Sequence, residues 1–196
     1  MVTNFHDADV TKLWDLRNKE KKTAEKKGIK LTFLPYIIEA VVDALKKHPI
    51  VNASLDGEEI VFKKYYNIGI AVDTDDGLIV PVLKNSDKKD KLGIAKELSE
   101  ISENARNRKL AIEDLRGGSF SITNLGSIGV KYFTPVLNYP ESGILGVGRI
   151  VEKARFEGKK VVAKKILPLS FTYDHRIVDG AVAARFMLDV IKKLEE

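Results

Sequence analysis

The chain has 196 residues, 44% of them hydrophobic and 31% charged, which fits a single globular domain. It contains no cysteine, which excludes disulfides, thiolate metal ligands and cysteine nucleophiles. The net charge is +5, and lysine dominates the basic residues. Lysines alternate with glutamates, as in "KEKKTAEKKG", and this pattern is typical of solvated helix faces. Because no apolar run reaches about 18 residues and no leader-like start is visible, we expect no membrane contact and a cytoplasmic protein, or a mitochondrial-matrix protein if the source is eukaryotic.

The first quarter of the chain predicts one strand and two helices. The strand is expected at residues 2–8, the first helix from Asp9 or Thr11 to Lys27, and the second from Thr32 to Lys47. Three strand-like runs follow near 58–64, 67–73 and 78–83, with turn signals at Asp56-Gly57 and Asp76-Gly77.

The remaining chain predicts a helix at 88–108, a short strand at 119–123, long strands joined near Glu157-Gly158, and a last helix from Gly180. Helices and strands therefore do not alternate strictly. This order predicts the α+β class, with a two-layer sandwich in which helices cover a mixed β-sheet, built as one domain over residues 1–196.

Several common sites lack their sequence patterns. "GSIGVK" does not have the spacing of a P-loop, "LGVGRIV" lacks the third glycine of a dinucleotide fingerprint, and no G-x-S-x-G elbow occurs. His6, His48 and His175 are scattered, so we expect no metal site. No stripe of aromatic residues interleaved with arginine supports a nucleic-acid partner, although a basic nucleic-acid binder remains a third hypothesis.

His175 is the strongest candidate for a catalytic group. It follows a strand with alternating apolar residues and precedes a helix, so its side chain can project from a rigid scaffold into a cleft. A neutral imidazole in such a place can act as a general base. The alternative interpretation is structural, with Asp179 as the N-cap of the helix and His175 as an ordinary turn residue.

"DHRIVDGA" resembles the active-site signature of the dihydrolipoamide acyltransferases, the E2 components of 2-oxo-acid dehydrogenase complexes, and is similar to the His-x-x-x-Asp-Gly motif of chloramphenicol acetyltransferase. Four blocks in the same order extend the resemblance over nearly the whole chain: "LTFLPYIIEAVVDALKKHPIVNASLD", "YYNIGIAVDTDDGLIVPVLKNSD", "GGSFSITNLGSIGVKYFTPVLNYPESGILGVGRI" and "LPLSFTYDHRIVDGAVAARF". The resemblance implies a chloramphenicol-acetyltransferase-like fold and acyl transfer between dihydrolipoamide and coenzyme A.

The resemblance also implies roles for individual residues. His175 matches the general base that takes the thiol proton, and Thr123 matches the hydroxyl that donates to the tetrahedral oxyanion. Asp179 matches the motif aspartate, which we expect to organise the turn. Arg176 and Asp73 match a buried ion pair near the site, and Asn124 continues the match with a role in loop structure only.

The family arrangement places the site between subunits of a homotrimer, with Thr123 and His175 from different chains, and such trimers build cores of 24 or 60 subunits. Coenzyme A is then a substrate, and lipoamide comes from a lipoyl domain outside this chain. The family's N-terminal arm, lipoyl domain and subunit-binding domain are absent from these 196 residues, so partners E1 and E3 would be recruited through missing domains. Glu39 stands where relatives often carry lysine, which argues against a coenzyme contact there.

Two further functions stay open. A diverged core can be a catalytically silent assembly scaffold, and a chloramphenicol-type enzyme would use a free hydroxyl acceptor. The acyl group, whether acetyl, succinyl or branched-chain, depends on pocket residues that the sequence alone does not locate.

Overall fold

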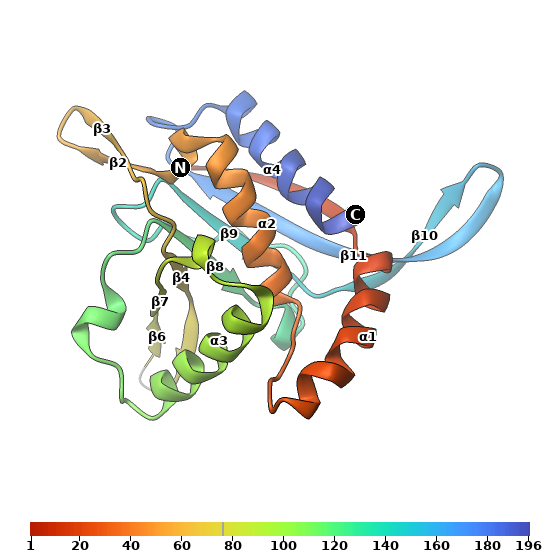
Figure 1. Ribbon diagram of the computed structural model, residues 1–196. Helices are drawn as coiled ribbons and strands as arrows, with labels where there is room; N and C mark the ends of the chain where they lie inside the picture. The colour runs from red at the N-terminus through yellow and green to blue at the C-terminus, as the bar shows by residue number, and fades with distance from the viewer. Residues whose placement is uncertain (76) are drawn as a thin grey trace.

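A mixed β-sheet is the frame of the molecule, seen here in a computed structural model that describes residues 1–75 and 77–196. Helices lie on one side of this sheet, and a long hairpin projects from one end of it (Figure 1). The described helices are α1 (Thr11–Lys26), α2 (Leu34–Lys47), α3 (Lys91–Arg106) and α4 (Gly180–Glu195). None of them has the length and apolar character that crossing a membrane requires.

The main sheet has seven strands among the described residues, in the order β1-β11-β9-β8-β4-β7, with β10 paired to the first half of β11. Its strands are β1 (Val2–Asp9), β4 (Ile68–Ile70), β7 (Val82–Leu83), β8 (Phe120–Asn124), β9 (Gly143–Val147), β10 (Val151–Glu157) and β11 (Lys160–Tyr173). Two small hairpins join β2 (Ala53–Asp56) to β3 (Glu59–Phe62) and β5 (Val72–Thr74) to β6 (Gly77–Ile79). β8 runs parallel to both β4 and β9, while β11 is antiparallel to β9, which makes the sheet mixed.

The hydrophobic core lies between the sheet and the helices. Phe120 of β8, Phe171 of β11 and Phe186 of α4 are fully buried, and their ring centroids lie 4.9–6.1 Å apart. Burying each such side chain contributes roughly 1.5–3 kcal/mol to stability, before the entropic cost of ordering is subtracted. This aromatic cluster therefore fixes α4 against the middle of the sheet.

The opposite face of the sheet carries small residues and is crossed by the segment between β8 and β9. A Cβ at Gly146 would lie 2.9 Å from the Phe133 ring, and one at Gly148 only 1.9 Å from the carbonyl oxygen of Lys131. Glycine at these two positions lets the crossing segment lie directly on the strands. The chain that follows β8 is thus held close to the sheet.

The predicted fold class is confirmed, and most predicted elements are present. The strand at 2–8, all four helices, the strand at 119–123 and the turn at Glu157-Gly158 occur within a few residues of the expected bounds. Asp56-Gly57 forms the predicted turn, with Asp56 opposite Glu59. The predicted turn Asp76-Gly77 includes Asp76, which lies outside the described residues.

The region between 53 and 83 differs from the prediction. β2 was not expected, and the runs 67–73 and 78–83 are each divided into two strands. The division of the second run falls at Pro81, which has no N–H to donate to a strand ladder. At the other division, the Ala71 N–H donates to the Ile122 carbonyl while Ile70 donates to Pro81, so neighbouring residues bond to different partners.

Candidate active site

His175 lies in the connection between β11 and α4. The N–H of Asp174 donates to the Ser142 carbonyl at 2.9 Å, and the Asp174 carbonyl accepts from Ile177 and Val178 at 3.0 and 2.9 Å. These bonds fix the backbone on both sides of His175. The imidazole itself is exposed, with its ring centroid 5.9 Å from that of the buried Tyr173. The imidazole is thus presented to solvent from a turn whose backbone is fixed by hydrogen bonds.

Asp179 is the N-cap of α4. Its carboxylate accepts the backbone N–H of Val182 at 2.8 Å, which satisfies one of the free N–H groups at the helix start. This hydrogen bond is the main reason that the pKa of Asp179 is lowered, and the nearby charges of Arg185 and His175 add to it. The structural interpretation of Asp179 is therefore confirmed, and the same contact fixes the end of the His175 turn.

The expected ion pair between Arg176 and Asp73 does not form within the described part of a single chain, and it stays a prediction for the assembled protein. Arg176 Nη2 lies 2.6 Å from Asp174 Oδ2, and its backbone N–H also donates to Asp174. This contact lowers the pKa of Asp174. Asp174, two residues away in the same turn, binds the guanidinium, whereas Asp73 on β5 is exposed. Because the Arg176 side chain is 69% exposed, this pair contributes little to stability.

Thr123 lies near the end of β8. Phe120 and Ile122 are buried in the core, so the alternation of a strand directs Ser121 and Thr123 to the opposite face. Thr123 is half-buried there. The next residue, Asn124, is exposed and accepts the Gly126 N–H at 3.0 Å, which agrees with its expected role in the loop.

The strand register separates Thr123 from His175. Thr123 is opposite Gly146 on β9, whereas Tyr173 is opposite Gly143, three positions away. Three residues span about 10 Å along the strands, and two strand spacings span about 10 Å across them. β11 continues beyond Tyr173 away from Thr123, so His175 lies farther still. One chain therefore does not bring the two groups together.

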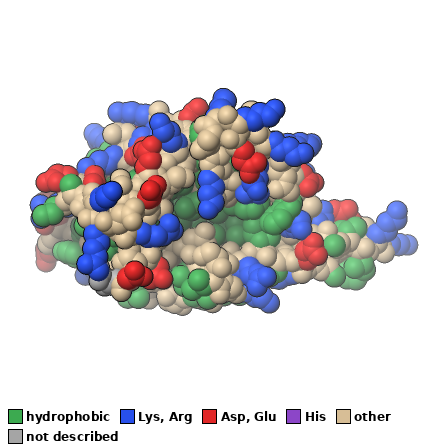
Figure 2. Space-filling model, turned by 90° about the horizontal axis from the view of Figure 1, so that it is seen from below, with side chains coloured by type: hydrophobic (Ala, Val, Ile, Leu, Met, Phe, Trp, Pro, Cys, Tyr) green, Lys and Arg blue, Asp and Glu red, His purple; other side chains and the backbone are tan. Residues whose placement is uncertain are grey.

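Each group has cavities beside it. A cavity of about 400 Å³ adjoins the His175 turn and is lined by Asp174, Arg176 and Ile177 together with Leu55, Leu137 and Tyr139. At the other end, two cavities of about 310 and 460 Å³ share Thr32, Leu34 and Asn124. Figure 2 looks onto the underside of the molecule and shows a hollow with hydrophobic side chains inside it and lysine and arginine side chains around it.

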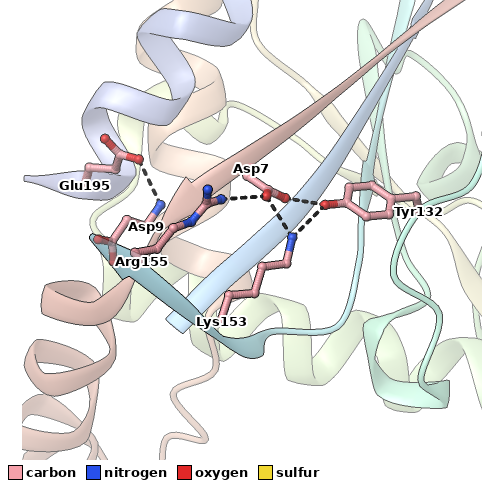
Figure 3. Close-up of polar contacts among 6 residues, drawn as sticks. All are labelled: Asp7, Asp9, Tyr132, Lys153, Arg155 and Glu195. Carbon is pink, nitrogen blue, oxygen red and sulfur yellow. Dashed lines mark hydrogen bonds and ion pairs between the residues drawn. The ribbon is translucent and has the colours of Figure 1, made fainter. Parts of the chain in front are cut away.

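A polar cluster fixes the segment that follows Thr123. The carboxylate of Asp7 on β1 accepts from Lys153 Nζ at 2.8 Å, from Arg155 Nη2 at 3.0 Å and from the Tyr132 hydroxyl (Figure 3). The Asp9 N–H also donates to Glu195 at 2.8 Å, which ties β1 to the end of α4. The cluster joins the crossing segment and the projecting hairpin to the edge strand of the sheet.

Sequence reasoning missed Glu141, a carboxyl buried beneath the His175 turn. Its side chain is 6% exposed, and burial raises its pKa to about 7 against the smaller opposing effects of Ser121 and Asn138. The available signal was a glutamate just before the wholly apolar strand 143–147. Elsewhere, no three His, Cys, Asp or Glu side chains in residues 1–75 and 77–196 are grouped to hold a metal ion.

Replacing Asp179 tests the cap. Asp179→Ala should lower the melting temperature by about 3 °C or more, because a helix N–H loses its acceptor. Asp179→Asn keeps an acceptor of equal quality and should melt within about 1 °C of the wild type. Calorimetry at neutral pH measures both, and equal melting temperatures for the two variants would contradict the capping role.

Glu141→Gln tests the buried carboxyl through the pH dependence of stability. In the unfolded chain this carboxyl ionises near 4.5, but in the folded chain near 7, so the folded state holds an extra proton between these values. Its contribution to the free energy of unfolding therefore falls as pH rises from about 4.5 to about 7, by at most ~3 kcal/mol. Denaturant titrations should show that Glu141→Gln gains stability over the wild type across this range. An unchanged difference between pH 4.5 and pH 8 would contradict the assignment.

The comparisons with known proteins agree on one family. The model of the 2-oxoacid dehydrogenases acyltransferase family (catalytic domain) matches residues 1–196. The dihydrolipoyllysine-residue acetyltransferase component of the pyruvate dehydrogenase complex from Cupriavidus necator is 50% identical over 185 residues, which are 94% of this chain and 34% of the relative. The Staphylococcus epidermidis protein of the same name is 47% identical over 195 residues, which are 98% of this chain and 45% of the relative. The chain spans less than half the length of these curated relatives.

Solved structures give the same result. The dihydrolipoamide acetyltransferase of Azotobacter vinelandii superposes with a TM-score of 0.97 at 44% identity, covering 100% of this chain and 81% of that one. Chloramphenicol acetyltransferase superposes with a TM-score of 0.64 at 15% identity, covering 98% of this chain and 87% of that one, which shows a shared fold. The resemblance found in the sequence is confirmed, and the chain belongs to the 2-oxoacid dehydrogenase acyltransferase family, in its catalytic domain.

Proposed function

We propose that this domain transfers acyl groups between dihydrolipoamide and coenzyme A, with His175 as the general base and Thr123 as the oxyanion donor. The observation that carries the proposal is the spacing of these residues. The Azotobacter vinelandii structure was used to examine a serine, a histidine and an asparagine in the catalytic mechanism of that enzyme. The serine and histidine are 52 positions apart, and the asparagine follows four positions later, which are the separations of Thr123, His175 and Asp179 here.

The proposed reaction needs no nucleophile from the protein. His175 takes the proton from the thiol of one substrate, and the thiolate attacks the thioester carbonyl carbon of the other. The oxygen becomes negatively charged and accepts a hydrogen bond from the Thr123 hydroxyl. When the tetrahedral intermediate collapses, the C–S bond of the original thioester breaks, and the departing thiolate takes the proton from His175. The absence of cysteine in the chain is compatible with this direct transfer.

We further infer that each site is shared by two subunits. Thr123 and His175 lie at different ends of the sheet within one chain, so a complete site needs Thr123 of one copy beside His175 of another. A ring of three copies satisfies this with one repeated contact. A related solved structure is the cubic core of the pyruvate dehydrogenase multienzyme complex, which supports a trimer that assembles further.

The cavities at the β8 end support binding of an elongated anionic substrate such as coenzyme A. Lys30 and Arg106 line one cavity, and Arg149 lines the other beside the apolar Trp14 and Ile37. Basic groups suit phosphates, and the apolar surface suits the uncharged arm between phosphate and thiol. The lipoyl domain that presents lipoamide, and contacts with E1 and E3, would belong to parts of a longer protein beyond this single catalytic domain.

His175→Ala should reduce transfer from acetyl-CoA to free dihydrolipoamide by at least ~100-fold, because the thiol loses its proton acceptor. His48, whose Nε2 lies 2.8 Å from Asp189 Oδ2 at the end of α2, provides a control. His48→Gln should stay within about threefold of the wild type, since this partly buried pair is not among the groups of the proposed reaction. Full activity of His175→Ala would remove His175 from the mechanism, and an inactive wild type would favour a silent scaffold.

The Thr123 hydroxyl can be tested with two variants, one that keeps the shape of threonine and one that keeps its hydroxyl. Thr123→Val removes the hydroxyl and should lower kcat by ~100-fold or more, the usual effect of losing an oxyanion donor. Thr123→Ser keeps the donor and should retain most of the activity. Equal rates for the valine and serine variants would contradict the role of Thr123.

The acyl group can be identified in the same assay. The wild-type rates with acetyl-, succinyl- and isobutyryl-CoA are compared for this purpose.

A further inference from the structure

Glu141 lies where the segment supporting the His175 turn meets the strand that carries Thr123. The neighbouring Ser142 carbonyl accepts the N–H of Asp174, the residue before His175, and the Ser142 hydroxyl donates to the Val51 carbonyl at 2.8 Å. Glu141 itself forms a β-bridge with Ser54. The backbone around Glu141 therefore joins the turn to the body of the protein.

The side chain of Glu141 reaches toward β8. Asn138 Nδ2 lies 3.2 Å from Glu141 Oε1 and 3.3 Å from the Ser121 hydroxyl, so one amide bridges the carboxyl to the strand. Ser121 precedes Thr123 by two positions and shares its face of β8. Gly118 provides the space, because a Cβ there would lie 2.6 Å from Oε1. The carboxyl is thus seated in a cradle next to the strand that presents Thr123.

No ion pair compensates a charge on this carboxyl in the part of the chain that the structure describes. Glu141 Oε2 is buried without a hydrogen-bond partner there. A cavity of about 330 Å³ adjoins it. The titratable or charged groups that line this cavity and the one beside the His175 turn are the α-amino group of Met1 and the side chains of Lys63, Tyr65, Arg116, Tyr139, Asp174 and Arg176. Burial without a paired cation favours the protonated carboxyl, in agreement with its pKa of about 7.

We propose that Glu141 is a positioning residue for acyl transfer, and that its neutral carboxyl holds the Thr123 strand and the His175 turn in their productive relation. The proposal rests on the proposed function of the domain. When the carboxyl ionises, the positive charges of Lys63 and Arg116 in the adjoining cavity attract it. This attraction competes with the hydrogen bond from the Asn138 amide and favours displacement of the carboxyl. A small displacement of a support beneath a catalytic group is enough to slow a reaction substantially.

The main test compares the pH profiles of kcat for the wild type and Glu141→Gln, with acetyl-CoA and dihydrolipoamide, from pH 6 to 8.5. Gln cannot ionise but keeps the shape and hydrogen-bonding capacity of a neutral carboxyl. The ratio of the variant's kcat to the wild type's should rise about threefold or more through a midpoint near pH 7, because the wild-type carboxyl ionises there and glutamine does not. Ionisations that both enzymes share cancel in the ratio. A flat ratio would overturn the proposal, as would a Gln variant that is as slow as Glu141→Ala.

The second test displaces the carboxyl without removing it. Gly118→Ala should push Glu141 out of its cradle and lower kcat by about tenfold while both KM values change less than about threefold. Glu141→Ala should have a similar effect, and the double variant Gly118→Ala/Glu141→Ala should be no slower than Glu141→Ala, since the two changes act on one contact. Additive losses would overturn the proposal. If the wild type is inactive, the proposed function fails; if the wild type is active and Glu141→Ala matches it, only the role of Glu141 fails.

Discussion

The register between β8, β9 and β11 is the constraint on which the rest of the structure depends. It places Thr123 opposite Gly146 and Tyr173 opposite Gly143, so that Thr123, the proposed oxyanion donor, and His175, the proposed base, lie toward different ends of one sheet. A shift of a single residue would also turn Phe120 and Phe171 out of the core, so burial specifies the register strongly. The same packing that stabilises the fold therefore separates the two groups and makes a second copy of the chain part of the proposed site.

The two faces of the sheet differ in what they contribute to the protein. The helix side supplies stability through an apolar core that includes the Phe120, Phe171 and Phe186 rings. The other side positions groups: glycines admit the crossing segment, Asp7 binds three donors from that segment and the hairpin, and Glu141 lies between β8 and the His175 turn. Burying a carboxyl there lowers the free energy of unfolding. A role in the reaction explains such a cost, whereas a role in stability does not.

Sequence signals predicted those parts of the structure that depend on interactions between residues close together in the chain. The four helices and the cap at Asp179 follow from apolar periodicity and end signals, and the fold class follows from the order of elements. Tertiary contacts decided the rest. Within one chain the Arg176 side chain pairs with Asp174 in its own turn, and Pro81 divides a run that sequence alternation predicted to be one strand. Glu141 was missed because its burial depends on contacts with residues some twenty positions away in the sequence. Asn138 links its carboxyl to Ser121, and Gly118 leaves room for it. Local pattern pointed to His175 as a candidate base, but the role of Thr123 came from the resemblance, since the two residues are not near each other in one chain.

Complementation between two inactive variants tests the shared site most directly. His175→Ala and Thr123→Val would be co-expressed in equal amounts, and the mixed oligomers assayed for transfer from acetyl-CoA to dihydrolipoamide. If each site takes Thr123 from one chain and His175 from its neighbour, random mixing restores about one quarter of the sites, and activity should return to ~25% of the wild type. Mixing His175→Ala with the double variant His175→Ala/Thr123→Val is the control, since no site there has both groups. Activity no higher than that of the two parent variants would contradict the account.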